Sequence, residues 1–235
     1  MKSRRHDPER LDDTGHDPEL LSRSLAHVEA VDRWLGGSRA LRRALAPLLP
    51  AQGRLSLLDV GTGDGGVARR LASWLTKRGL AVDAIGLDLH PEILAAASRR
   101  GEVSSPNARA ALRLVRGDAL RLPFSDDAFH LAISTLTLHH FGDHEARRIV
   151  REMARVASIG VLVGDLERHT VHHLGARLLS ATLWRRNPIT RHDGPLSVLR
   201  SFTSSELADV GTGAGLRDVR VRRHPFFRLV LVGRP

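Results

Sequence analysis

The sequence contains no cysteine and no tyrosine among its 235 residues, and aromatic residues make up only 4% of it. Without cysteine the chain can form neither disulfide bonds nor thiolate metal sites, and catalysis by a cysteine nucleophile is excluded. The chain also lacks a run of about 18 apolar residues, the length that a membrane-spanning helix requires, and its charged N-terminus lacks the apolar core of a signal peptide. We therefore expect a cytoplasmic protein that does not insert into a membrane.

Lysine is scarce as well, although the formal net charge is +10. Only Lys2 and Lys77 are lysines, and the arginines are scattered along the chain in runs no longer than pairs such as Arg69-Arg70. A nucleic-acid-binding surface would cluster these charges and supply aromatic platforms for bases. We interpret the arginines as solvated helix faces, with an RNA-binding surface as the alternative.

The hydrophobic pattern divides the chain into three parts. Residues 1–16 are charged and aperiodic, which predicts a disordered tail. Residues 17–50 have helical spacing and predict an N-terminal helical cover, which begins at Asp17 as N-cap and Pro18. From residue 51 to 235, short apolar runs alternate with helical patterns, which predicts a mostly parallel, doubly wound α/β sheet.

The expected sheet has seven strands. The predicted strands are 54–60, 81–89, 111–119, 128–136, 160–166 and an antiparallel hairpin within 218–233. The segment of about 168–202 that follows the fifth strand is too long for a connection and contains a helical pattern. Insertions over the carboxyl ends of parallel strands cover binding sites, so we interpret it as a lid.

The stretch "LDVGTGDGG" at residues 58–66 fits two cofactor patterns. Gly61, Gly63 and Gly66 satisfy the dinucleotide pattern G-x-G-x-x-G, whereas Gly61, Gly63 and Gly65 satisfy the looser G-x-G-x-G of S-adenosylmethionine (SAM) sites. Asp59 stands two residues before the first glycine, where an acidic group suits a ligand that carries an ammonium group. The glycines alone do not discriminate between the two cofactors.

Acidic residues at the next strand ends add to this pattern. Asp88 ends the second strand and can accept hydrogen bonds from ribose hydroxyls in either cofactor class. Asp118, in "GDA" at the end of the third strand, can accept from an adenine amino group.

Together these motifs resemble those of class I SAM-dependent methyltransferases, from about residue 17 to the end of the chain. The alternatives are a nicotinamide enzyme and a merely flexible glycine turn. The runs "LDVGTGDGG", "GLDLHPE", "GDALRLPFSDDAFH", "LHHF" and "REMARV" are most similar to small-molecule enzymes related to the menaquinone/ubiquinone C-methyltransferases, and "RHDGPLSVLRSF" resembles bacterial methyltransferases associated with polyketide pathways.

The resemblance implies a Rossmann-like fold, SAM as cofactor and S-adenosylhomocysteine as product. It assigns ten residues to the cofactor site, namely Asp59, Gly61, Thr62, Gly63, Gly65, Asp88, Leu89, Asp118, Ala119 and Ser134. Two positions depart from the family pattern. His130 replaces an Asp that is mainly structural, which could shift the packing of the fourth strand, and Gly164 precedes Asp165 where a polar residue is expected.

The turn after the fourth strand, "TLHHFGD", carries the candidate catalytic residues. A phenol has a pKa of about 10, and a histidine near about 6.5 is neutral enough at pH 7 to take its proton as the oxygen attacks. The run resembles that of plant-type O-methyltransferases, which implies that His139 is the general base. His140 is the second candidate, and the alternative is that these imidazoles only pack or cap the following helix.

Side chains of the cover and the lid are candidates for binding the acceptor, namely Trp34, His169, Trp184, His192, Asp193 and Arg200. The two tryptophans would favour a flat, apolar molecule. His169 and His173 have the i, i+4 spacing of zinc ligands, but no third ligand accompanies them in the usual pattern, so no metal site is expected. "DGP" at 193–195 predicts a turn.

We therefore expect methyl transfer from SAM to a small aromatic acceptor of phenolic or quinone type. O-methylation is favoured, and C-methylation is next. An RNA or protein methyltransferase and a non-catalytic SAM-binding regulator are the alternatives. The sequence leaves open the identity of the acceptor and the oligomeric state.

Overall fold

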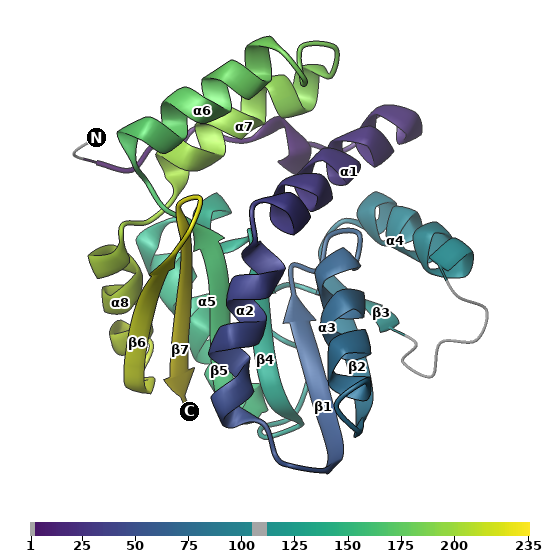
Figure 1. Cartoon of the computed structure of the whole chain (residues 1–235), viewed down its shortest axis with the longest axis vertical. Coiled ribbons are helices and arrows are strands. Elements are labelled where there is room, and N and C mark those ends of the chain that lie inside the picture. The colour runs from purple at the N-terminus through teal and green to yellow at the C-terminus, as the bar shows by residue number, and fades with distance from the viewer. Residues whose placement is uncertain (1–2, 105–111) are drawn as a thin grey trace.

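A seven-stranded sheet forms the centre of the computed structural model, which describes residues 3–104 and 112–235 (Figure 1). Its strands are β1 Gly53–Val60, β2 Leu80–Asp88, β3 Leu112–Arg116, β4 Phe129–Thr135, β5 Ala157–Leu166, β6 Arg217–His224 and β7 Arg228–Arg234. Their order in the sheet is β3-β2-β1-β4-β5-β7-β6. Strands β1 to β5 pair in parallel, and β7 runs antiparallel to both of its neighbours. The predicted Rossmann-like fold class is confirmed; residue 111, where the third strand was expected to begin, lies outside the described residues.

Helices cover both faces of the sheet. They are α1 Pro18–Trp34, α2 Gly37–Leu45, α3 Gly66–Thr76, α4 Pro91–Ser104, α5 Asp143–Val156, α6 Thr170–Ala181, α7 Pro188–Arg200 and α8 Ser204–Gly213. Side chains of successive strand residues point to opposite faces. Leu57 accordingly joins the core under α2 and α3, whereas Leu58 joins the core under α5 and α8. The result is a three-layer architecture whose strand ends are free to carry a site.

The carboxyl ends of the parallel strands are covered by α1, α6 and α7 together with the N-terminal segment (Figure 1). Helix α1 begins as predicted, since the side chain of Asp17 accepts from two backbone amides of the first turn. Helices α6 and α7 occupy the predicted lid. Within the described residues, no helix combines the length and the apolar character that a membrane crossing requires.

Two local predictions differ from the structure. The run 193–195, expected to be a turn, lies inside α7, because the Asn187 side chain caps that helix from two amides and the helix continues through Pro195. The third strand, expected to extend to residue 119, ends at Arg116.

The departure at His130 is accommodated by new hydrogen bonds. Nδ1 of His130 lies 2.7 Å from Oγ of Ser56 and 3.0 Å from its backbone nitrogen, so the imidazole links β4 to β1. The register between β4 and β5 shifts between Phe129 and Leu131, on either side of this residue. At Gly164 a Cβ atom would lie 3.0 Å from Cγ2 of Thr135, so a larger residue would crowd β4.

The N-terminal segment differs most from expectation. Instead of a disordered tail, residues 3–16 lie against the lid and the strand ends, and Arg4 and Glu9 are only 9% and 2% exposed. The Arg4 guanidinium donates to the carbonyl oxygens of Arg200, at 2.6 Å, and Phe141, at 2.9 Å, and pairs with Asp143. It also lies 3.6 Å over the ring of Phe202. A buried cation with this many partners fixes a segment that has no hydrophobic periodicity.

Replacing Arg4 by alanine should therefore lower the free energy of unfolding by about 2–3 kcal/mol, because buried carbonyl acceptors lose their donor. Arg5→Ala is the matched control, since the Arg5 side chain is exposed and pairs only with Asp7; its effect should stay within about 0.5 kcal/mol. Urea unfolding measures both. Equal effects of the two variants would show that the segment is not docked through Arg4.

Candidate active site

The loop between β1 and α3 has a backbone that requires glycine. Gly61, Gly63 and Gly65 have φ angles of 70°, 55° and 73°, in the left-handed region that side chains disfavour. A Cβ atom at Gly61 would lie 2.4 Å from Cγ2 of Thr137, whereas one at Gly63 would meet no atom of residues 3–104 or 112–235 within 4 Å. Gly61 thus permits a close contact inside the protein, and Gly63 borders open space.

That space is a cavity of about 310 Å³, which we call the glycine-loop cavity. Seven of the ten residues predicted to bind the cofactor line it, namely Gly61, Thr62, Gly63, Asp88, Leu89, Asp118 and Ala119. The other three do not. Gly65 is the N-cap of α3, Ser134 is buried and donates to the carbonyl oxygen of Val60, and Asp59 lies beneath the loop, where it accepts from the Thr62 hydroxyl at 2.8 Å.

The residues of the glycine-loop cavity fit a SAM molecule. Asp88, at the end of β2, accepts from the backbone amides of Gly63 and His90, and burial raises its pKa. Asp118 lines the part of the cavity beyond β3. Within the described part of the chain, Oδ1 of Asp59 is buried without a hydrogen-bond partner. Asp88 and Asp118 on the cavity wall, together with the unpaired oxygen of Asp59 beneath the loop, favour a ligand that carries hydroxyl, amine and ammonium donors.

The buried carboxyl of Asp59 should make stability depend on pH, because burial raises its pKa to about 7. An unfolded aspartate ionises near pH 3.9. Between these values the folded protein retains a proton that the unfolded chain has lost, so the contribution of Asp59 is full below about pH 4 and is lost as the pH rises through 7. Asp59→Asn removes the titration. Relative to wild type, this variant should gain a few kcal/mol of stability between pH 4 and pH 8, measured by urea unfolding at each pH. A pH-independent difference would contradict the assignment.

A second, larger cavity of about 490 Å³ lies under the lid, and we call it the lid cavity. Most of its lining is aliphatic or aromatic. It comes largely from α1, α6 and α7 and includes buried Trp184, in the connection between α6 and α7. Gly194 permits that tryptophan to pack, since a Cβ there would lie 2.5 Å from its ring. Polar residues also line it, among them Glu9, His139 and His140. Such a cavity suits a flat apolar molecule with one polar group.

The two cavities adjoin. Four residues line both of them, namely Leu11, Val28, Leu136 and His140. Leu136, which follows β4, has a φ angle of 54°, a strained conformation for a residue with a side chain. Its amide donates to the carbonyl oxygen of Gly164, which holds the strained turn at the boundary. A ligand in one cavity could therefore reach a ligand in the other.

His139 is held by a buried carboxylate. Its Nδ1 lies 2.7 Å from Oδ1 of Asp165, at the end of β5, and its backbone amide donates to Oδ2 of the same residue at 3.2 Å. Burial by itself would raise the pKa of Asp165, but the contact with His139 holds that pKa below its ordinary value. An ionised partner at Nδ1 favours the tautomer that carries its proton there, which leaves the Nε2 lone pair free in the lid cavity.

His140 has a corresponding partner on the N-terminal segment. Its Nδ1 lies 2.8 Å from Oδ1 of Asp12. Burial would lower the pKa of His140, but the carboxylates of Glu9 and Asp12 outweigh that effect and raise the pKa to about 9.

The residues predicted to bind the acceptor are divided between the lid cavity and other places. Trp184 and Asp193 line the lid cavity. Trp34, the last residue of α1, is 73% exposed and is not among the residues that line either cavity. His169 caps α6 and stacks on Phe227, and His192 pairs with Asp193. Arg200 is buried and donates to the carbonyl oxygens of both His139 and His140. Its guanidinium therefore holds the turn after β4 in place and is not directed at a ligand.

Sequence reasoning missed three acidic residues of this site: Glu9, Asp12 and Asp165. Asp165 had a usable signal, because it ends a parallel strand as Asp59 and Asp88 do. Glu9 and Asp12 gave none, since their segment shows no periodicity and is held by polar contacts. Asp193 accepts from the amides of Arg10 and Leu11, which fastens that segment to the lid.

Comparison with known proteins relates this arrangement to enzymes. A family model described as a methyltransferase domain matches residues 57–160. A demethylmenaquinone methyltransferase from Roseiflexus sp. (strain RS-1) is 37% identical over 135 residues, which are 57% of this chain and 50% of the relative. An ajmaline N-methyltransferase from Rauvolfia serpentina is 31% identical over 108 residues, 46% of this chain and 34% of the relative. The chain thus spans half or less of the length of these two relatives.

Solved structures share the fold. A SAM-dependent methyltransferase from Aquifex aeolicus superposes with a TM-score of 0.62 over 93% of this chain and 98% of its own, at 15% sequence identity. The segment matched by the family model ends before the lid and begins after the N-terminal segment, so the lid cavity lies largely outside it.

Proposed function

We propose that the chain is a class I SAM-dependent methyltransferase, in line with the methyltransferase-domain match over residues 57–160, and that it methylates a hydroxyl group on a small, flat, largely apolar acceptor held in the lid cavity. SAM supplies, when bound, a methyl group on a sulfonium centre that a nucleophile can displace. The residues of this chain that would hold SAM are those that line the glycine-loop cavity, above all Gly63, Asp88 and Asp118.

The observation that carries the proposal is the buried pair of His139 and Asp165 at the wall of the lid cavity. Nε2 of His139 can take the proton of an acceptor hydroxyl as its oxygen attacks, which makes His139 the general base. Asp165 keeps the imidazole in the required tautomer and stabilises the positive charge that develops on it. Leu136 and His140, which line both cavities, would keep the acceptor oxygen facing the methyl group and so supply orientation.

The apolar lining of the lid cavity supports an aromatic acceptor of phenolic or quinol type. The relatives are named for demethylmenaquinone and for the nitrogen of ajmaline, so the name of a relative does not select the atom. We place the methyl group on oxygen because the proton that His139 removes is that of the hydroxyl itself. A ring carbon that shares the charge of the resulting phenolate is the next candidate.

Transfer of labelled methyl from SAM to three matched compounds tests the proposal: a bicyclic phenol, its methyl ether and the corresponding aromatic amine. We expect label on the phenol alone, with the methylated atom identified by NMR. Label on the amine and none on the phenol would overturn the choice of a hydroxyl acceptor. Label on a ring carbon of the phenol would be consistent with His139 as the base, but it would show that the methylated atom is carbon and not oxygen.

A further inference from the structure

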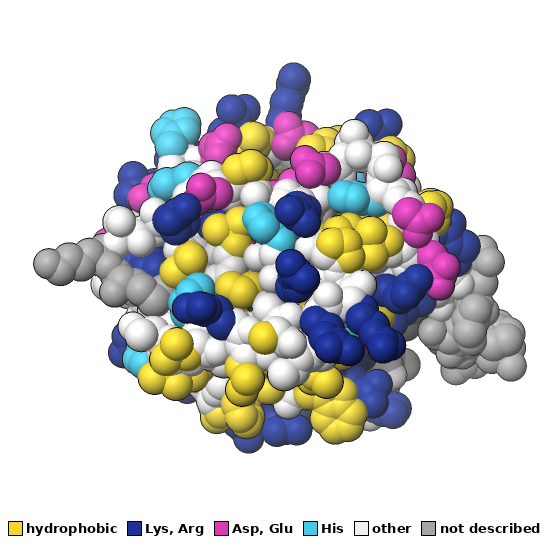
Figure 2. Space-filling model, turned by 90° about the horizontal axis from the view of Figure 1, so that it is seen from above, with side chains coloured by type: hydrophobic (Ala, Val, Ile, Leu, Met, Phe, Trp, Pro, Cys, Tyr) yellow, Lys and Arg dark blue, Asp and Glu magenta, His cyan; other side chains and the backbone are white. Residues whose placement is uncertain are grey.

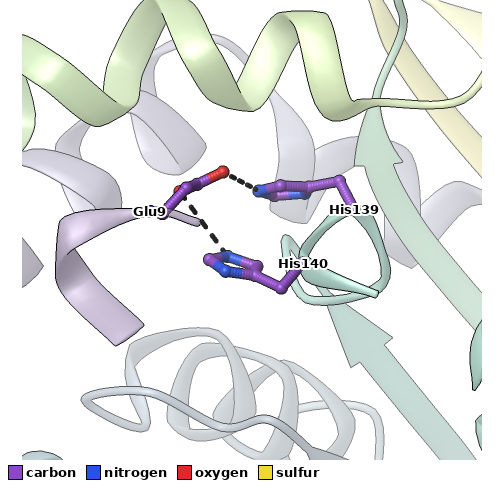
Figure 3. A group of neighbouring side chains, drawn as sticks. All are labelled: Glu9, His139 and His140. Carbon is purple, nitrogen blue, oxygen red and sulfur yellow. Dashed lines mark ion pairs between the residues drawn. The ribbon is translucent and has the colours of Figure 1, made fainter. Parts of the chain in front are cut away.

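Three side chains at the boundary between the cavities turn ligand atoms toward one another (Figure 3). Oε1 of Glu9 lies 3.7 Å from Nε2 of His139, and Oε2 of Glu9 lies 3.8 Å from Nε2 of His140. One atom from each residue lies within 4.8 Å of the other two. Both separations exceed the length of a hydrogen bond, so the carboxylate faces two imidazole nitrogens without bonding to either.

Both imidazoles are oriented from behind by carboxylates. Nδ1 of His139 contacts Asp165 at 2.7 Å, and Nδ1 of His140 contacts Asp12 at 2.8 Å. Histidine ligands of metal ions show this arrangement, in which a carboxylate on one ring nitrogen fixes the tautomer and directs the other nitrogen at the ion. Here two such pairs converge on a third carboxylate. General-base catalysis by His139 requires only one of them.

The charges around these atoms favour a cation. Glu9, Asp12 and Asp165 supply three carboxylates. The cations beside Glu9 are Arg200, with its Nε 3.6 Å from Oε1, and protonated His140, whose proton a metal ion would displace. Oε2 of Glu9 accepts from the Ser197 hydroxyl at 3.0 Å, but Oε1 is buried and has no hydrogen-bond partner among the residues that the structure describes. A buried carboxylate oxygen without a partner is costly, and a bound cation would relieve that cost.

We propose that Glu9, His139 and His140 bind a divalent transition-metal ion such as Zn²⁺, and that this ion competes with the acceptor hydroxyl for Nε2 of His139. Two imidazoles and one carboxylate form a ligand set that suits Zn²⁺. Ligands about 2.0–2.1 Å from a tetrahedral ion lie about 3.4 Å apart. One atom from each of the three residues lies within 4.8 Å of the others, so binding draws these atoms together by at most about 1.4 Å. All three residues line the lid cavity, which leaves a fourth position open toward it.

Competition follows from the chemistry of a single lone pair. The Nε2 pair that would take the acceptor proton is the pair that would bind the ion, so the ion-bound enzyme lacks its base. Metal binding itself does not depend on the proposed function; only the competition does.

Calorimetric titration of metal-free protein with Zn²⁺, and absorption spectra with Co²⁺, test the binding. We expect one ion per chain in wild type and at least about 100-fold weaker binding in Glu9→Gln and in His140→Gln, with about 10-fold weakening in Asp12→Asn. If Glu9→Gln disturbs the N-terminal segment, His140→Gln still tests whether these residues bind the ion. Metal-free unfolding curves report that disturbance separately.

The paired substitution His169→Ala with His173→Ala is the control, because these histidines have ligand spacing on α6 but do not adjoin Glu9. It should retain wild-type affinity. Loss of binding in this control, or equal binding in wild type, Glu9→Gln and His140→Gln, would overturn the proposal by placing the ion elsewhere.

Kinetics separate this proposal from the proposed function. If the enzyme transfers methyl to a phenol, Zn²⁺ should raise the apparent KM for the phenol without changing the affinity for SAM. Tight binding to the three residues in an enzyme that methylates no phenol would support the metal site and remove the function. An enzyme that methylates the phenol but binds no ion would support the proposed function and exclude the metal site.

Discussion

Replacing His139 by glutamine should lower kcat for methyl transfer by about 10²–10⁴-fold while the affinity for SAM stays that of wild type. The loss is that of general-base catalysis, which contributes about this factor. Glutamine keeps a polar group at the wall of the lid cavity but cannot take a proton at neutral pH. His139 lines the lid cavity and not the glycine-loop cavity, so the cofactor site should be unchanged.

The control for this prediction is His130→Gln. His130 lies on β4, the strand that leads to the catalytic turn, but its imidazole bonds to Ser56 and lines neither cavity. It should change stability and leave kcat within about twofold of wild type. Single-turnover rates with saturating acceptor, together with calorimetric binding of SAM, measure both quantities. Unchanged turnover in His139→Gln would exclude a general base at this position.

Gly63→Ala should weaken SAM binding by about 10- to 100-fold. A methyl group at Gly63 would meet no protein atom, so its space is that of the glycine-loop cavity itself. Forcing an extra methyl into an occupied site costs about 1–3 kcal/mol, and each 1.4 kcal/mol corresponds to a tenfold change in affinity.

Gly79→Ala supplies the matched control for backbone strain. Gly79 also has a positive φ, 87°, and also has open space at its Cβ position, but it precedes β2 and lines neither cavity. Both variants should lose about 1 kcal/mol of stability from the strained backbone. Only Gly63→Ala should lose affinity for SAM. Equal affinities in the two variants would place the cofactor away from the loop.

The sheet and its cofactor loop could be predicted from the sequence because both depend on local patterns. Apolar runs bounded by glycine identify buried strands. Acidic residues at the carboxyl ends of parallel strands lie at the same edge of the sheet, whatever path the connections take. The sequence therefore placed Asp88 and Asp118 at this edge of the sheet, where both line the glycine-loop cavity, without knowledge of any contact. Asp59 was predicted in the same way, but in the structure it lies buried beneath the loop, where it accepts from the Thr62 hydroxyl.

The acceptor side could be predicted only in part, because it depends on contacts between distant segments. Glu9 reaches His139 across a separation of 130 residues, and Arg4 fastens that segment through carbonyl oxygens that no sequence pattern marks. Trp34 and Trp184 looked equivalent in the sequence, yet only Trp184 faces the lid cavity, where Gly194 leaves room for its ring.

The lid end of the molecule also bears on the class of acceptor. Viewed from above, arginine side chains are mixed with hydrophobic and acidic side chains over the lid and the N-terminal segment (Figure 2). A mixed surface gives a polynucleotide no continuous positive track along its phosphates. This distribution supports a small-molecule acceptor over an RNA.

The central claim is methyl transfer to a small molecule in the lid cavity, and one measurement tests it most directly. Purified protein is incubated with methyl-labelled SAM and an extract of its source organism, which is then separated into organic-soluble, RNA and protein fractions. The account predicts label in the organic-soluble fraction, and it predicts that this label disappears with His139→Gln. Label confined to RNA or protein would contradict the account.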